Sequence, residues 1–148
     1  MKYFLFLVPI LFITCTQEKI NPAYDASLFW KEHHKQTWDS LTTANQLSGI
    51  WDWVYQSCCP EGIMKHQDTS GSGIYVVFGH SDIQVYEKNT LKETATWSVY
   101  FRENEQTYML ATNPPISFLH GRILFYKEYV LFNNSYIDGE NNYFKKRN

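Results

Sequence analysis

Residues 94–101 read Thr-Ala-Thr-Trp-Ser-Val-Tyr-Phe, the cleanest alternation of apolar and polar side chains in this chain. Ala95, Trp97, Val99 and Phe101 share one parity, and the polar side chains occupy the other. Because successive side chains of a strand point to opposite faces, this period of two predicts a half-buried β-strand.

Similar segments follow one another from residue 47 to the end of the chain, about eight in all. Short turn signals rich in Gly, Asn, Asp and Pro separate them, and no helix-length amphipathic segment intervenes. This pattern predicts an all-β fold, an eight-stranded antiparallel up-and-down barrel, since closure removes exposed sheet edges. A two-sheet sandwich has the same strand count and stays as the alternative. The expected strands lie around 51–55, 74–78, 83–86, 94–101, 107–112, 117–126, 129–133 and 142–147.

The composition supports β structure and excludes one class of partner. Aromatic residues make up 18% of the chain, and such side chains suit a pleated, half-buried surface. The net charge is -2, so no basic field for nucleic acid exists. A length of 148 residues fits one domain, which we expect to be a monomer.

The first residues have the pattern of an export signal. Lys2 precedes an almost unbroken apolar run from Tyr3 to Ile13, too short for the ~20 residues of a spanning helix. Thr14-Cys15 follows, and the chain then turns polar, which resembles the lipobox of bacterial lipoproteins with Phe12 and Thr14 at its variable positions. We therefore expect residues 1–14 to be a lipoprotein signal peptide, with Cys15 acylated, for example by palmitate. An ordinary secretory signal is the alternative.

Residues 15–46 are expected to form a lipid tether followed by a short helix. The polar stretch 16–26 predicts a linker, and 27–43 has an incomplete helical pattern behind Asp25 or Ser27 as N-cap. His33 and His34 fall in this helix, where we expect them to be exposed and without a function.

Leu47-Ser48-Gly49-Ile50-Trp51 opens the predicted barrel, residues 47–148, with a Gly-x-Trp motif. This resembles the start of lipocalins and of small bacterial lipocalin-like domains. The segment Ile123 to Phe132 before an Asp-Gly turn, and the final aromatic-basic strand 143–147, are similar in layout.

The resemblance implies that Trp51 plugs the closed end of the barrel. It further implies a cation–π contact from the last strand, with Arg147 as the expected cation and Lys145 next, and a close backbone passage at Gly49.

Trp53 and Tyr55 share the parity of Trp51, so we expect them to face inward, as we do Trp97 and Phe101. These four side chains are the candidate contacts for a small apolar ligand, and plain core filling is the competing role.

No residue pattern indicates catalysis, a metal or a cofactor. The sequence has no nucleophile elbow, His-Glu-x-x-His or phosphate-binding loop. Cys58-Cys59, with His66 nearby, lack the second cysteine pair of a closed zinc site, and they are either oxidised or free thiols.

The expected function is therefore that of a non-enzymatic lipoprotein of the bacterial envelope. It would be anchored to the outer membrane, on the periplasmic or the surface face, and bind a small apolar ligand. The alternative is a filled barrel whose loops, such as the one from Cys58 to Ser72, bind another envelope protein or act as an inhibitor.

Overall fold

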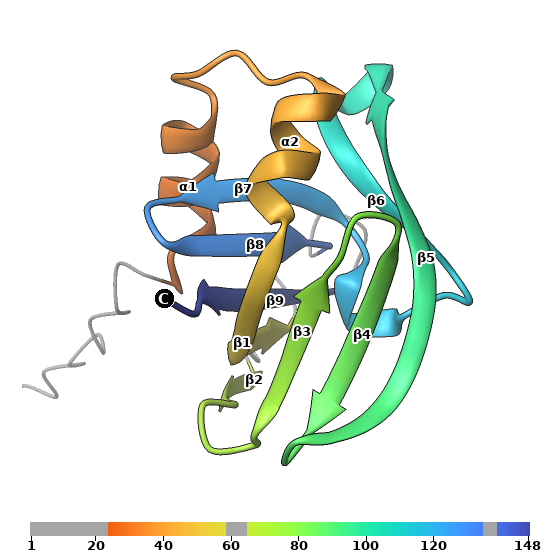
Figure 1. Cartoon of the computed structure of the whole chain (residues 1–148). Helices are drawn as coiled ribbons and strands as arrows, with labels where there is room; N and C mark the ends of the chain where they lie inside the picture. Colours follow the sequence, from red (N-terminus) through yellow and green to blue (C-terminus); the bar gives the residue numbers. More distant parts are fainter. Residues whose placement is uncertain (1–23, 59–64, 135–138) are drawn as a thin grey trace, which may run out of the picture.

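The computed structural model describes residues 24–58, 65–134 and 139–148, and within them two short helices precede an antiparallel β-barrel (Figure 1). The helices are α1 (Ala26–His33) and α2 (Ser40–Leu47). Two 3₁₀ turns follow later, η2 (Glu103–Glu105) and η3 (Ser117–Leu119). The strands are β1 (Gly49–Cys58), β2 (Lys65–Asp68), β3 (Ile74–Phe78), β4 (Asp82–Glu87), β5 (Thr90–Arg102), β6 (Thr107–Asn113), β7 (Arg122–Tyr126), β8 (Tyr129–Asn133) and β9 (Glu140–Lys146).

The barrel closes because β1, the first strand of the ring, pairs with β3 along one edge and with the last strand, β9, along the other. Its first half pairs with β3 along Gly49–Asp52, and its other edge pairs with β9. Eight of the described strands, β1 and β3 to β9, form the ring in sequence order. The short β2 pairs only with the distal part of β1, from Tyr55 to Cys58. The predicted eight-stranded up-and-down barrel is confirmed, and the sandwich alternative is excluded.

A β-bulge at Val54 interrupts the β1–β9 ladder. Trp53 pairs with Phe144 and Tyr55 with Tyr143, which leaves Val54 as the extra residue of β1. An inserted residue reverses the inside–outside alternation beyond it. Phe144 lies in the interior cluster, whereas Val54 and Tyr143 lie in a separate outer cluster.

Two expected elements are wrong in extent. The single helix predicted over 27–43 is two helices, because a second N-cap interrupts the pattern. Asp25 Oδ1 accepts the Ser27 N–H at 2.9 Å, and Asp39 Oδ1 accepts the Thr42 N–H at 2.6 Å. Each aspartate satisfies a free amide of a first helical turn.

The strand predicted over 117–126 begins only at Arg122. Its first residues form η3 instead, with Phe118 and Leu119 packed on the barrel core. An apolar run has the same appearance in a strand and in a buried turn, so the sequence alone did not separate them.

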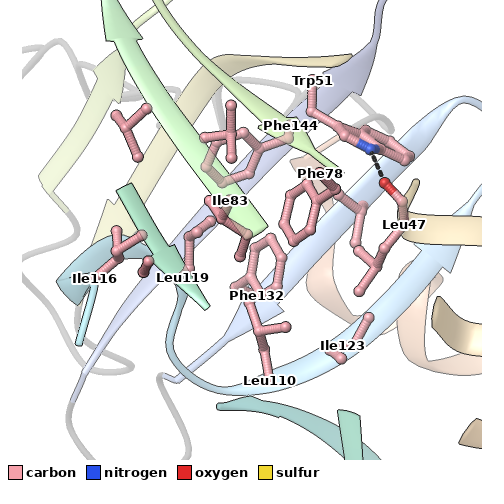
Figure 2. Packing of buried hydrophobic residues seen from close by; sticks show 14 of the residues in the cluster. Leu47, Trp51, Phe78, Ile83, Leu110, Ile116, Leu119, Ile123, Phe132 and Phe144 are labelled. Carbon is pink, nitrogen blue, oxygen red and sulfur yellow. Dashed lines mark hydrogen bonds between the residues drawn. The ribbon is translucent and has the colours of Figure 1, made fainter. Parts of the chain in front are cut away.

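The interior core is continuous from the α2 end of the barrel to η3 (Figure 2). Its fully buried side chains come from α2, most of the strands and the segment before β7. They include Leu47, Trp51, Val76, Ile83, Ile116, Leu119, Ile123, Val130, Phe132 and Phe144.

Trp51 is fully buried in the interior cluster beside α2. Its Nε1–H donates to the Leu47 carbonyl at 2.6 Å, the last residue of α2 (Figure 2). Gly49, at φ 118°, has the left-handed backbone that favours glycine, and a Cβ there would lie 3.5 Å from Lys146 Cε.

The cation over Trp51 is Lys146, so the expectations for Arg147 and Lys145 are wrong. Lys146 Nζ lies 5.1 Å from the indole centroid and donates to the Gln46 carbonyl at 3.1 Å. Arg147 lies over Tyr75 and pairs with Asp52, and Lys145 lies over Tyr129. The resemblance placed a basic residue on the last strand, but the register, which the sequence leaves open, selects the one that faces inward.

Replacing Lys146 by Met is expected to lower the free energy of unfolding by about 1–3 kcal/mol, because both the cation–π contact and the charged hydrogen bond are lost. The matched variant Lys145→Met, whose ammonium lies 5.8 Å from the Tyr129 ring on an exposed side chain, is expected to change it by less than about 0.5 kcal/mol. Urea unfolding of both variants measures the difference, and equal losses would contradict the assignment of Lys146.

Candidate functional site

The barrel interior, where a ligand was expected, holds side chains of η3 and of the segment before it. Ile116 and Leu119 are fully buried in the interior cluster. Phe118 stacks on Trp53, with 5.5 Å between ring centroids, and on Phe144 at 6.1 Å. A connection that folds into the barrel therefore occupies the volume that a hollow barrel keeps for its ligand.

Trp53 and Trp97 face the interior as predicted, and both contribute to its packing. Trp53 Nε1–H donates to Asn142 Oδ1 at 3.1 Å. Trp97 meets Phe78 edge to face at 5.3 Å, and its Nε1–H donates to the Gly79 carbonyl at 3.2 Å. Both indole N–H groups are thus bonded within the protein, as half-buried indoles require.

Tyr55 does not face inward, and that expectation is wrong. Beyond the bulge it turns to the outside of the barrel, where its ring stacks on Tyr24 at 4.2 Å. Phe101 has the inward parity but lies at the end of β5, where it is exposed and contacts Tyr108 at 5.1 Å. The four candidate residues therefore do not converge on one site.

Helix α1 covers an outer cluster on the opposite side of the barrel wall. Phe29 is fully buried there against Leu124, Leu131 and Tyr143. Its ring meets those of Tyr126 and Tyr143 edge to face, each at 5.6 Å. Burial in this cluster raises the pKa of Tyr143 to about 12.

His33, at the end of α1, is buried, which corrects the expectation of an exposed residue. Its side chain is 3% exposed, and its ring stacks on Trp38 with 4.7 Å between centroids. The Phe125 N–H of β7 donates to His33 Nδ1 at 3.2 Å. Burial, with the neighbouring His34 as a second cause, lowers the pKa of His33 to about 4, so the ring is neutral at pH 7.

A row of side chains crosses the outside of β5, β6 and β7 to α1, exposed at its two ends, Tyr100 and Trp30, and covered between them, where Met109 is buried and Arg122 half-buried. Tyr100 is opposite Met109, and Met109 is opposite Arg122, so the three share one face of the sheet. The Arg122 guanidinium lies 5.1 Å from the centroid of the Trp30 ring on α1. We call Tyr100, Met109, Arg122 and Trp30 the Trp30–Tyr100 surface.

Glu105 of η2 compensates the charge of this surface. Arg122 Nε donates to Glu105 Oε2 at 2.7 Å, and Arg102 Nη1 lies 3.0 Å from Glu105 Oε1. Glu105 is itself nearly buried, so the carboxylate fixes the orientation of the Arg122 side chain over Trp30. Trp30 is therefore 38% exposed beside a guanidinium held in place, and Tyr100 is 46% exposed at the other end of the row.

Sequence reasoning missed this surface because its members come from four separate segments. The alternation of its strand puts Tyr100 on the polar parity, and the sequence pattern predicts Trp30 in a short amphipathic helix. Only the cross-strand register and the docking of α1 bring them together.

No family model, curated protein or solved structure matches this chain. The closed eight-stranded barrel is consistent with a calycin-like fold, and this conclusion depends on the pairing of the described strands alone.

Among the described residues no group of His, Cys, Asp and Glu side chains is arranged to hold a metal ion. Cys58 is disulfide-bonded, and the other cysteines of the sequence, Cys15 and Cys59, lie outside the described residues. The side chain of His66 also lies outside them. In the described part of the chain, no helix combines the length and apolar character needed to cross a bilayer.

Replacing Phe118 by Ala is expected to open a cavity beside Trp53. The variant should lose about 2–4 kcal/mol of stability and should bind a small fluorescent hydrophobic probe, which the unchanged protein should not bind. Phe101→Ala, which removes an exposed ring of the same size, is the control and should not gain probe binding. Saturable probe binding by the unchanged protein would contradict a filled interior and favour the hypothesis of a small apolar ligand.

Proposed function

We propose that this protein is a lipid-anchored interaction module, in which a filled barrel presents the Trp30–Tyr100 surface to another protein of the cell envelope. One observation supports this choice above the ligand-binding alternative: side chains of the chain itself, including the inserted η3, pack the interior. A barrel whose interior is packed with its own side chains favours recognition through its outer surface.

The proposed anchor is based on the sequence features at the N-terminus. A positive residue, an apolar run of signal length and Thr14-Cys15 favour lipidation of Cys15. The described part of the chain begins at Tyr24, which lies on the outer wall of the barrel, stacks on Tyr55 and meets Tyr143 edge to face at 5.7 Å. Tyr24 is nine positions after Cys15 in sequence, a span of at most ~30 Å, so an anchored domain stays close to its bilayer.

Lipidation predicts that cells grown with radiolabelled palmitate incorporate the label into this protein, and that Cys15→Ser abolishes incorporation. Cys59→Ser is the matched control, and it should keep the label because only the cysteine after the apolar run is modified. Label that persists in Cys15→Ser, or that is absent from the unchanged protein, would contradict the anchor.

The chemistry of the surface favours a protein partner. Trp, Tyr and Arg are enriched where proteins meet, and they dominate binding energies measured by truncation. Since Glu105 pairs with Arg122, we expect the partner to offer an apolar contact for Trp30 and Tyr100 rather than an acidic patch.

A photo-cross-linking residue placed at Tyr100 is expected to give a discrete cross-linked product in intact cells. The same residue placed at Leu91, on the same strand and 50% exposed, is the matched control and should give none. In the Tyr100 experiment, Trp30→Ser should reduce the yield about tenfold or more, the effect of losing a central aromatic contact. Leu41→Ser, which removes an exposed apolar residue of α2, should leave the yield unchanged.

Equal products from positions 100 and 91, or a yield indifferent to Trp30→Ser, would exclude this surface as the binding site. Neither result would bear on the barrel interior, which the probe-binding experiment tests separately.

A further inference from the structure

The strand β7 is paired along its whole length on only one of its edges. It pairs with β8 over its whole length, from Arg122–Asn133 to Tyr126–Tyr129. On the other edge β6 pairs with it at a single position, Met109 with Arg122. Helix α1 lies beside the remainder of that edge (Figure 1).

The amide of Phe125 shows what replaces the missing strand. Alternate residues of an antiparallel pair direct their N–H groups toward the partner strand or away from it. Phe125 directs its N–H away from β8, and the group donates to His33 Nδ1 at 3.2 Å. The imidazole therefore takes the place of a strand carbonyl at a buried edge, where an unpaired amide is costly.

This hydrogen bond defines the protonation state of the ring. Nδ1 accepts a hydrogen, so it carries none, and the proton of the neutral imidazole is on Nε2. Trp38 holds the ring from one side by stacking, and its Nε1–H donates to the His33 carbonyl at 2.8 Å. A proton added to Nδ1 would face the Phe125 N–H and turn an attractive contact into a repulsive one.

We propose that His33 is a proton-sensitive latch that holds α1 on the open edge of β7, and that protonation of its Nδ1 releases α1 from the barrel.

The charged and titratable groups around this contact have other partners, so they do not take the place of His33. His34 is next to His33 on α1, with 5.4 Å between ring centroids, and its charge opposes a second charge on His33. On β7, Arg122 is directed toward Trp30 and Glu105, and Tyr126 toward Phe29 and Lys127. On β8, Tyr129 meets Tyr24 and Lys145.

The direction of the pH effect follows from the two states of His33. Docked, the ring has a pKa of about 4, and released into water it returns to about 6.5. The released state therefore binds the proton more tightly, so docking is strongest above pH 6.5 and weakens as the pH falls toward 4. Between pH 8 and pH 5 the equilibrium constant for release should rise about 30-fold.

Release would also dismantle the Trp30–Tyr100 surface, because Trp30 is on α1 and Arg122 is on β7. This consequence depends on the proposed function, whereas the latch itself does not. Its test needs no partner and no lipid anchor.

The experiment is amide hydrogen exchange, followed by NMR on the full chain and corrected for the intrinsic effect of pH. We expect the protection of the Phe125 amide to fall about 30-fold from pH 8 to pH 5, while amides of β4, which has a partner strand on both edges, keep theirs. Protection at Phe125 that does not change with pH overturns the latch. An equal fall in β4 also overturns it, since it would report unfolding of the whole domain.

A variant separates the ring from other acid effects. Asparagine places its amide oxygen near the position of Nδ1 and does not titrate, so His33→Asn should make protection at Phe125 independent of pH. His34→Asn is the control and should keep the pH dependence. If His33→Asn does not fold, the ¹⁵N chemical shifts of the His33 ring in the unchanged protein test the latch instead, because they report whether Nδ1 carries a proton. An Nδ1 that is unprotonated at pH 6 supports the latch, and a ring that titrates near pH 6.5 with Phe125 still protected overturns it.

Discussion

The β-bulge at Val54 determines which aromatic side chains of β1 fill the barrel and which meet the helix outside it. Before the bulge, Trp51 and Trp53 face inward and pack with Phe144 and Phe118. After it, Tyr55 faces outward with Tyr143, and the two rings lie 5.6 Å apart. Without the inserted residue, one continuous parity would turn Tyr55 inward and remove its ring from the outer wall.

That outer surface is what α1 docks on. Phe29 enters it, Tyr24 stacks on Tyr55, and the end of α1 then reaches the free edge of β7. The docking also brings Trp30 over Arg122. The candidate surface and the His33 contact therefore have one origin, a helix that covers both the outer face and the incomplete edge of the barrel.

The sequence predicted the fold well because its signals are local. Alternation in residues 94–101 and short turns between strands predict an antiparallel barrel, and in the structure Gly49 has a positive φ and Trp51 is hydrogen-bonded to Leu47. The errors concern register. A bulge has no sequence signature of its own, so the alternation alone predicts Tyr55 inside. The choice among Lys145, Lys146 and Arg147 depends on a single step along β9.

The site was less predictable, because neighbours in sequence have opposite environments. His33 is buried and hydrogen-bonded to a strand amide, whereas His34 is exposed and bonds to the Trp30 carbonyl of its own helix at 2.8 Å. Nothing in the pair His-His indicates which ring meets the barrel. A strand that completes the edge of a sheet supplies carbonyl groups, which do not titrate near neutral pH. A helix has no free carbonyl along its side and must use a side chain. When that side chain is histidine, the stability of the edge becomes linked to pH, which an additional strand would have avoided.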